Sequence, residues 1–485
     1  MSEIKDNIKR GLFWTAVDKY SGQIIAIGIS MVLARLLTPG DYGIVATATV
    51  FLSFLGIFTS IGIGPAVIQR KDLTQEDLNN IFTFTVIIGG ICALIAFGSS
   101  WLIADFYGNE VLRPVMQIFS IGVFIGAINM VPSALMSKNL RFKEMATRNL
   151  LFQIFFGVIG IAAAFMGAGV YALILPSIAS SLCSFLYNNH FYPVRINLRF
   201  SFVSIKKIFS FSSYLFLFEL FTYFSRNLDK VIIGKDISEN ALGYYEKSYR
   251  LMQLPLQNVT AVIYPVLQPV LSSLQDNMKE MSSKCNKIIS MIACIGFPLC
   301  AILYFCGEEI VIVMFGDQWG PSIPTFKILS LSVPFMMILY PTGPFFLASN
   351  SSKTLFYTGI INTTVTICGY IIAIYIDKTT EAIAWSVSIT VILNSINSYF
   401  NLYNRVMKAS LVPLLKGFIR PMTCTILVFC TYIGYEYMSL HLPLFASLVV
   451  KGLIGLLVAL IYYNFVGIVN IKELYCLLIR KLKCH

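Results

Sequence analysis

The chain has 485 residues, of which 57% are hydrophobic and only 12% are charged. A typical soluble domain is about 25% charged, so this composition excludes a soluble protein, including one with a single membrane anchor, and indicates an integral membrane protein. The formal net charge of +12 suggests nucleic-acid binding, but the positions of the basic residues argue against it.

Apolar segments long enough to cross a membrane, which takes roughly 20 residues, recur along the whole chain. The first segment is too long for a signal peptide and lacks a small-residue cleavage site, so it is expected to remain as a span. The predicted fold is therefore all-α, a polytopic membrane protein with about fourteen transmembrane helices, at residues 12–36, 43–67, 81–104, 114–136, 149–167, 170–188, 208–233, 241–270, 286–305, 322–348, 354–376, 380–403, 418–437 and 443–467.

The first two segments carry the most specific pattern. Asp18 and Lys19 lie in the middle of an apolar helix, where charges are costly and by default face a protein interior or a watery cavity. That helix ends at Ala34-Arg35-Leu36-Leu37, and the following Thr38-Pro39-Gly40-Asp41-Tyr42-Gly43 predicts a turn before the second helix.

A related pattern recurs 200 positions later. The equivalent positions are Lys19 and Glu219, Arg35 and Lys235, Gly43 and Gly243, and Pro65 and Pro265. A twofold repeat with charges in corresponding helices is typical of transporters. We expect an N-terminal lobe of six helices at residues 1–190, a C-terminal lobe of six helices at 191–405 with its preceding linker, and two further helices with a basic tail at 406–485.

Basic residues are distributed unevenly between the two sides of the membrane. With the N-terminus inside, about 25 of the 36 Lys and Arg residues fall in inner loops and tails and about three in outer loops. This bias follows the positive-inside rule and predicts a multi-pass protein of the cell (inner, cytoplasmic) membrane with both termini cytoplasmic. The positive charge is thereby explained by topology, with membrane lipids as partner and no nucleic acid.

Two loops have distinct predictions of their own. The longest outer loop, 306–321, contains Phe315-Gly316-Asp317-Gln318-Trp319, which predicts a turn with an interfacial tryptophan. The inner segment 137–148 is basic and amphipathic, which predicts a short interfacial segment.

The first hairpin also carries a family resemblance. Trp14-Thr15-Ala16 together with the segment from Ala34 to Ala46 resembles the opening of the polysaccharide transporter branch of the MOP superfamily, and most closely Wzx-type flippases of O-antigen and capsule repeat units. Gly243-Tyr244-Tyr245, Leu254-Pro255 and Tyr264-Pro265-Val266 are similar to this family's second lobe.

The resemblance implies fourteen helices in two six-helix lobes (MOP/MATE-like) plus two C-terminal helices. It implies flipping of an undecaprenyl-pyrophosphate-linked oligosaccharide from the inner to the outer leaflet, for lipopolysaccharide, capsule or exopolysaccharide. Glycan polymerase and chain-length proteins are the further partners it implies. The protein is then a transporter and not an enzyme.

Three predicted helices, 12–36, 208–233 and 241–270, carry charged residues at depth, and these helices are expected to line a central cleft. Phosphate oxygens need charge-assisted donors, and glutamines can hydrogen-bond sugars. The predicted substrate-binding residues are Lys19, Gln23, Arg226, Lys230, Lys247, Arg250 and Gln253, and Arg35 and Lys235 are expected at the outer mouth.

The alternative is that these charges pair with one another and hold helices together. Arg226 with Asp229, and Glu246 with Arg250, are spaced to pair within one helix. Asp18 and Glu219 are the candidates for ion coupling, because desolvation can hold a carboxylate protonated until a conformational change releases the proton. A static ion pair with Lys19 or Arg226 is the alternative for these two acids.

Two other functions compete with a flippase. A cation-coupled drug exporter of the same superfamily would favour an acidic or aromatic cavity, whereas cations here are at least as numerous as acids. A membrane polysaccharide polymerase or ligase would need a sizeable outer loop with catalytic residues, and the outer loops are short. Neither metal-ligand cysteine spacing nor a histidine cluster nor a nucleotide-binding loop occurs in the sequence, so no catalytic residue, metal or cofactor is expected.

Overall fold

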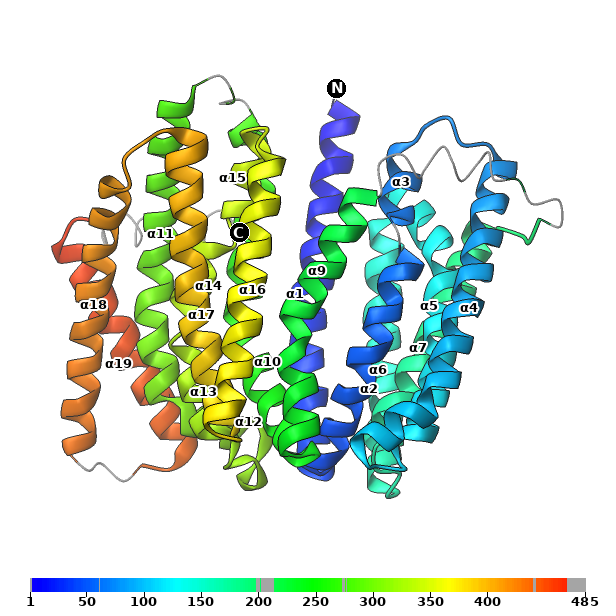
Figure 1. The fold of residues 1–485 in the computed structure, drawn as a ribbon, viewed down its shortest axis with the longest axis horizontal. Helices are drawn as coiled ribbons and strands as arrows, with labels where there is room; N and C mark the ends of the chain where they lie inside the picture. The colour runs from blue at the N-terminus through cyan, green and yellow to red at the C-terminus, as the bar shows by residue number, and fades with distance from the viewer. Residues whose placement is uncertain are drawn as a thin grey trace. The chain divides into compact units, whose positions relative to one another are not determined.

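The computed structural model describes residues 2–60, 62–197, 201, 213–272, 275, 277–438 and 442–468. Within these ranges, the side chains of residues 2–10, 12, 60, 213–219, 221, 259–270 and 272 are not described. The described chain consists of helices and short connections (Figure 1). It divides into two compact units, Met1–Glu246 and Lys247–His485.

The N-terminal unit contains the helices of the first hairpin and their neighbours. Its elements are α1 (Ser2–Leu36), α2 (Pro39–Ser60), α3 (Ile63–Gln69), α4 (Gln75–Tyr107), α5 (Leu112–Lys138), α6 (Phe142–Phe165), α7 (Tyr171–Phe191), α9 (Ser213–Ile232), the π-helical turn η1 (Ile233–Ile237) and the start of α10 (Glu239–Ser272). Helix α5 packs on α4 and α7, α1 packs on α6, and α2 packs on α4, α5 and α9. Buried apolar side chains of α2, α4, α5 and α7 form one continuous core.

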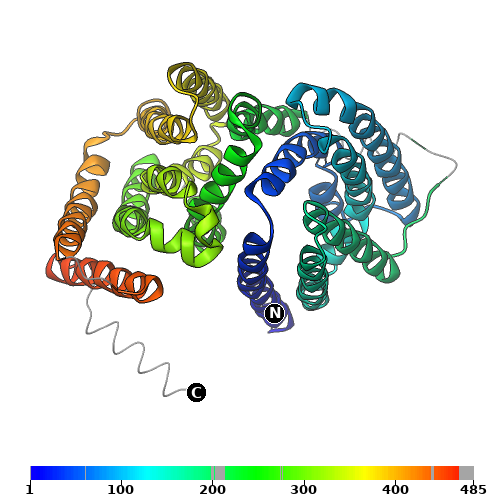
Figure 2. The ribbon, with the colours of Figure 1, turned by 90° about the horizontal axis from the view of Figure 1, so that it is seen from below.

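The C-terminal unit contains the rest of α10 and all later elements. These are α11 (Met278–Phe305), α12 (Gly307–Phe315), the 3₁₀ turn η2 (Asp317–Trp319), α13 (Ser322–Ser330), α14 (Val333–Leu339), α15 (Thr342–Ala348), α16 (Ser352–Ile376), α17 (Thr380–Asn401), the π-helical turn η3 (Leu402–Met407), α18 (Val412–Tyr437) and α19 (Leu444–Phe465). Helix α11 packs on α14, α18 and α19, and α16 packs on α17. The orange α18 and red α19 lie side by side (Figure 2).

The predicted all-α, polytopic membrane protein is confirmed. Ten helical segments in the described residues are long and apolar enough to cross a membrane, and the pair Ser322–Ser330 and Val333–Ala348, bent by 47°, forms an eleventh if it is one span. Helices α1, α9 and α10 are long but are not among these candidates, and they are the helices in which the sequence places charges at depth. Each predicted segment falls on a helix or on a run of consecutive helices, except that residues 208–212 of the segment 208–233 lie outside the described residues.

The segment Thr38–Gly43, predicted as a turn, is the capped first turn of α2. The Thr38 backbone N–H donates to Asp41 Oδ2 at 2.9 Å, and the Asp41 N–H donates to Thr38 Oγ1 at 3.2 Å. This reciprocal pair is a capping box, and Pro39 at the first helical position is pre-organised for helix. The second helix therefore begins at residue 39 rather than 43.

The structure corrects parts of two loop predictions, while the turn predicted around residues 315–319 is confirmed by η2. Helix α6 begins at Phe142, so most of the predicted interfacial segment 137–148 is the first part of a helix, and Arg148 in it is buried. The predicted outer loop 306–321 contains α12 and η2, and Trp319 is 0% exposed rather than interfacial. Among its contacts, Trp319 packs on the ring of Phe315, with 5.8 Å between ring centroids, and its own ring centroid lies 5.5 Å from the Lys247 ammonium.

Candidate functional site

Charged residues of α9 and α10 pair between the two helices within the N-terminal unit. Lys230 Nζ lies 2.7 Å from Glu246 Oε2, with both side chains largely buried. Asp229, which is 1% exposed, accepts a hydrogen bond of 2.7 Å from the Tyr245 hydroxyl. Glu246 thus takes its partner from α9, and the within-helix pairs predicted from spacing do not appear among the described interactions of these residues.

Lys247 is buried although it carries a charge. It is 2% exposed, and its ammonium lies 4.6 Å from the centroid of the Phe315 ring and 5.5 Å from that of Trp319. Cation–π contacts of this kind stabilise a desolvated ammonium. The substrate-binding role predicted for Lys247 stays a prediction, and its burial beneath two aromatic rings favours a packing role.

The other predicted cations of these helices are accessible. Lys19, Arg226 and Arg250 are exposed, and in the part of the chain that the structure describes none of the three has an ion-pair partner. Gln23 and Gln253 are partly buried. The side chain of Glu219 lies outside the described residues.

Asp18 is connected to a buried arginine that sequence analysis placed in an inner loop. Asn149 of α6 donates from Nδ2 to Asp18 Oδ2 at 2.9 Å, and Arg148 Nη2 donates to Asn149 Oδ1 at 2.7 Å. Arg148 Nη1 donates to Asn188 Oδ1, and Asn188 Nδ2 donates to Asn129 Oδ1 at 2.9 Å. Asp18 therefore hydrogen-bonds the Asn149 amide, and this amide in turn accepts a hydrogen bond from the Arg148 guanidinium.

This polar network links four helices of the N-terminal unit. Arg148 is 7% exposed and Asn188 is 0% exposed. A buried arginine is costly unless its donors and its charge are satisfied. The amides accept from both terminal nitrogens of Arg148 and Asp18 supplies a nearby negative charge, whereas the buried Arg148 Nε has no hydrogen-bond partner among the described residues. The sequence holds a signal, since Asn129 lies within one predicted apolar segment and Asn149 and Asn188 lie at the ends of two others. Nothing in the sequence shows that three separate helices bring these residues together.

The residues predicted for the outer mouth occupy different surroundings. Arg35 is exposed in the last turn of α1, where a cation interacts favourably with the helix dipole. Lys235 in η1 donates a hydrogen bond to the carbonyl oxygen of Phe106, the residue before the last of α4. The Lys235 ammonium also lies 4.6 Å from the centroid of the Phe106 ring.

The first turns of α2 and α10 are in close backbone contact. A Cβ atom on Gly43 would lie 2.0 Å from the carbonyl oxygen of Glu239, and one on Gly243 would lie 2.0 Å from the carbonyl oxygen of Pro39. Only glycine permits so close an approach of two backbones. Gly43 and Gly243, and likewise Pro39 and Glu239, are separated by the 200-residue offset of the predicted repeat, and their contact is reciprocal. The repeat itself stays a prediction.

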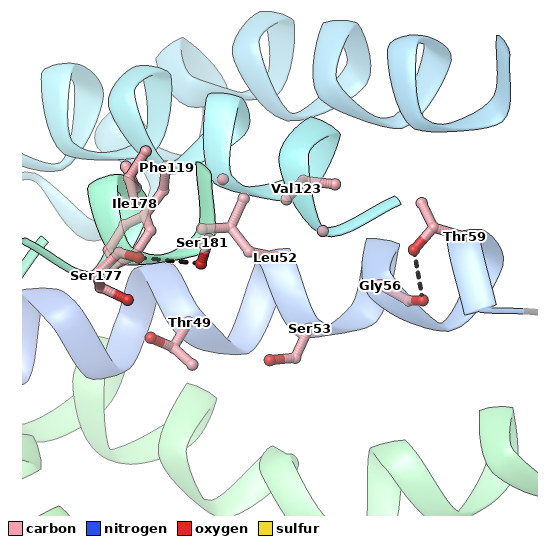
Figure 3. Close-up of a pocket in the computed structure, with 12 residues that line it drawn as sticks. Thr49, Leu52, Ser53, Gly56, Thr59, Phe119, Val123, Ser177, Ile178 and Ser181 are labelled. Carbon is pink, nitrogen blue, oxygen red and sulfur yellow. Dashed lines mark hydrogen bonds between the residues drawn. The ribbon is translucent and has the colours of Figure 1, made fainter. Parts of the chain in front are cut away.

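A cavity of about 280 Å³ lies between α2, α5 and α7 (Figure 3). Its lining is uncharged and rich in hydroxyl groups and glycine: Thr49, Leu52, Ser53, Gly56, Thr59, Phe119, Gly122, Val123, Gly126, Ser177, Ile178 and Ser181. None of the predicted site residues lines it. The signal in the sequence is the recurrence of Thr49, Ser53, Gly56 and Thr59 every three or four residues along α2.

These features are not accompanied by a metal-binding cluster in the described part of the chain. Among the described residues, no group of three or more His, Cys, Asp or Glu side chains could hold a metal ion. The described side chains provide a set of exposed cations, the charge pairs between α9 and α10, the polar network around Arg148, and a cavity lined by hydroxyl groups.

Comparison with known proteins gives consistent matches. Residues 32–324 match the protein family described as "Polysaccharide biosynthesis protein". The chain is 24% identical over 362 residues to the teichuronic acid biosynthesis protein TuaB of Bacillus subtilis (strain 168), covering 74% of each chain. It is 22% identical over 427 residues to the lipopolysaccharide biosynthesis protein WzxC of Escherichia coli (strain K12), covering 84% of this chain and 83% of WzxC.

The fold also has solved counterparts. The lipid II flippase MurJ in an inward closed conformation superposes with a TM-score of 0.72 at 16% sequence identity, covering 94% of this chain and 98% of MurJ. At this identity the likeness establishes the fold and leaves the substrate open.

Proposed function

Because the chain belongs to the polysaccharide biosynthesis protein family and has the fold of MOP-superfamily transporters, we propose that it is a flippase for undecaprenyl-pyrophosphate-linked oligosaccharide repeat units. It moves them from the inner to the outer leaflet for the synthesis of a surface polysaccharide. The names of WzxC, TuaB and MurJ support this class of substrate. Transport occurs by alternating access around a polar cleft, with the polyprenyl tail left in lipid.

The proposed membrane topology counts every long helix of the described chain as a span. The ten candidate spans, the bent pair as one span, and α1, α9 and α10 together give fourteen. An even number agrees with both termini in the cytoplasm, the orientation that the charge bias favours. The three helices added in this way are polar, as expected for helices that face a cleft rather than lipid.

The observation that carries the proposal is the accessibility of Lys19, Arg226 and Arg250. These cations lie on the polar helices α1, α9 and α10, they are exposed, and within the described chain they have no ion-pair partner. A cation in such a position has its charge available for a phosphate, which binds arginine through paired hydrogen bonds and lysine as a point charge. Gln23 and Gln253, partly buried on the same helices, are the proposed sugar contacts.

The test measures surface glycan and flipping separately. Lys19→Ala, Arg226→Ala and Arg250→Ala are each expected to abolish surface glycan while the protein remains in the membrane. Lys378→Ala is the matched control, because Lys378 is an exposed cation in the loop after α16. In liposomes, wild-type protein should flip an undecaprenyl-pyrophosphate-linked saccharide. Normal amounts of surface glycan in all three variants would reject the phosphate-binding role of these cations. Transport of cationic drugs in place of the lipid-linked saccharide would favour a drug exporter.

Ion coupling is proposed to use Asp18 and Glu219. The support for Asp18 is its hydrogen bond to Asn149, which ties α1 to α6 when the carboxylate is ionised and acts as acceptor. Imposing pH and sodium gradients one at a time on the same liposomes identifies the ion. Asp18→Asn and Glu219→Gln are expected to remove the response to that gradient, and an unchanged response would assign coupling elsewhere.

A further inference from the structure

Two polar contacts join the end of α4 to the start of α10 within the N-terminal unit. Lys235 binds the Phe106 carbonyl oxygen and lies over the Phe106 ring. Asn109, which follows α4, donates from Nδ2 to Glu239 Oε1 at 2.5 Å. We call Phe106, Asn109, Lys235 and Glu239 the α4–α10 latch.

The partners of Lys235 in the latch carry no charge. The ammonium is exposed, and the structure gives it a carbonyl oxygen and an aromatic face but, among the described residues, no carboxylate. An ammonium is attracted to a phosphate oxygen by the charges of both groups as well as by the hydrogen bond, whereas a carbonyl oxygen offers only a dipole. A phosphate group that reaches Lys235 is therefore a stronger partner than Phe106.

The backbone at the latch is suited to rearrangement. Lys235 belongs to η1, a π-helical turn between α9 and α10. Such turns are rare in proteins, and many of those that occur are found at functional sites. Gly234 in the same turn packs closely on α4, since a Cβ atom there would lie 3.0 Å from Tyr107 Cε1. The Tyr107 hydroxyl also approaches the Val231 carbonyl oxygen at 3.5 Å. Loss of the Lys235 contact thus leaves few polar contacts holding η1 to α4.

We propose that the pyrophosphate headgroup of the transported lipid opens the α4–α10 latch by taking Lys235 from Phe106. This inference rests on the proposed flippase function, whose topology places the latch at the outer face. The headgroup is then both the cargo and the signal for parting α10 from α4, so that release is tied to the arrival of an anionic substrate.

Because η1 leads directly into α10, parting η1 from α4 is expected to move the first turn of α10, and the distance between α2 and α10 beside the latch reports that movement. A Cβ atom on Gly40 would lie 2.8 Å from Asn240 Oδ1 and 3.9 Å from Asn240 Cγ. Replacing both residues by cysteine removes the Asn240 side chain and brings two thiols within reach of a disulfide. The double variant Gly40→Cys with Asn240→Cys keeps all four latch residues.

The experiment follows the rate of this disulfide in full-length protein in phosphatidylcholine nanodiscs, with mass spectrometry of the linked peptides because the chain has eleven native cysteines. Undecaprenyl pyrophosphate is expected to slow disulfide formation several-fold, and neutral undecaprenol is expected to leave it unchanged. With Lys235→Met added, the rate should no longer respond to undecaprenyl pyrophosphate. The single-cysteine variants control for other pairings.

Three outcomes overturn the inference: no slowing by undecaprenyl pyrophosphate, equal slowing with Lys235→Met, or equal slowing by phosphatidylglycerol, which would assign the response to any anionic lipid. Flipping by the wild-type protein is measured in parallel. Flipping with an unresponsive disulfide rejects the latch and leaves the flippase standing, whereas absence of flipping rejects the flippase.

Discussion

Gly43 of α2 and Gly243 of α10 each lie against the backbone of the other helix's first turn. A Cβ atom added to either glycine would lie 2.0 Å from a carbonyl oxygen of that turn. No real Cβ fits at that distance, so Gly43→Ala or Gly243→Ala must push the two turns apart. We expect either variant to lower the melting temperature of the purified protein by several degrees, measured by intrinsic fluorescence in detergent. The two together should cost less than the sum, because the first substitution already separates the turns.

Gly98→Ala is the control for helix propensity. Gly98 is an exposed residue of α4 with no atom within 4 Å of an added Cβ, so alanine there should stabilise the helix by about 0.5–1 kcal/mol. If Gly43→Ala behaved like Gly98→Ala, the close contact between α2 and α10 would be wrong.

A charge swap decides whether Lys230 serves the fold or the substrate. Its ion pair with Glu246 is 2.7 Å long and largely buried, so Lys230→Met should destabilise the protein by about 1.5–3 kcal/mol, the range for hydrogen bonds to charged groups. The swap Lys230→Glu with Glu246→Lys should restore much of the melting temperature and of surface glycan. Restored stability without restored glycan would instead return Lys230 to the substrate-binding residues.

The sequence predicts the helices of this fold well and their contacts poorly. Hydropathy and the sequence pattern of the first hairpin, around Asp18 and Gly43, are local properties. Hydropathy locates the membrane segments, and the hairpin pattern carries the resemblance to the flippase family. The partners of Glu246 and Arg148 depend on which helices pack together, and spacing within one helix could not reveal them. Lys247 shows the same limit, because only the fold brings Phe315 and Trp319 over its ammonium.

The geometry around Arg148 predicts that lysine is a poor substitute. Its two terminal nitrogens donate to different amides, those of Asn188 and Asn149, and a lysine ammonium lacks this fork. Arg148→Lys should therefore cost about 1.5–3 kcal/mol, seen as a lower melting temperature. Arg141→Lys is the control, because Arg141 makes a surface ion pair with Glu144 at 3.2 Å, and such pairs contribute about 0–1 kcal/mol. Equal effects of the two substitutions would argue against the network.

The buried pair Glu309–Lys451 makes a prediction about how α19 is attached to the C-terminal unit. Lys451 Nζ of α19 lies 2.5 Å from Glu309 Oε1 of α12, with the side chains 12% and 6% exposed. Ser447 donates to the same carboxylate at 2.8 Å, and Lys451 also approaches the Phe305 carbonyl oxygen at 3.3 Å. The pair thus fixes α19 against α12 and the end of α11.

Removing one partner should be worse than removing both. Lys451→Met leaves an uncompensated carboxylate in a buried site, which costs about 3–5 kcal/mol, whereas neutral replacement of a whole buried pair is often tolerated. We therefore expect Lys451→Met to lower the melting temperature strongly and Glu309→Gln with Lys451→Met to recover most of the loss. Proteolysis between α18 and α19 should rise in the single variant and fall again in the double. If the double variant were as unstable as the single one, the stabilisation of α19 would come from the packing of the lysine stem rather than from the ion pair.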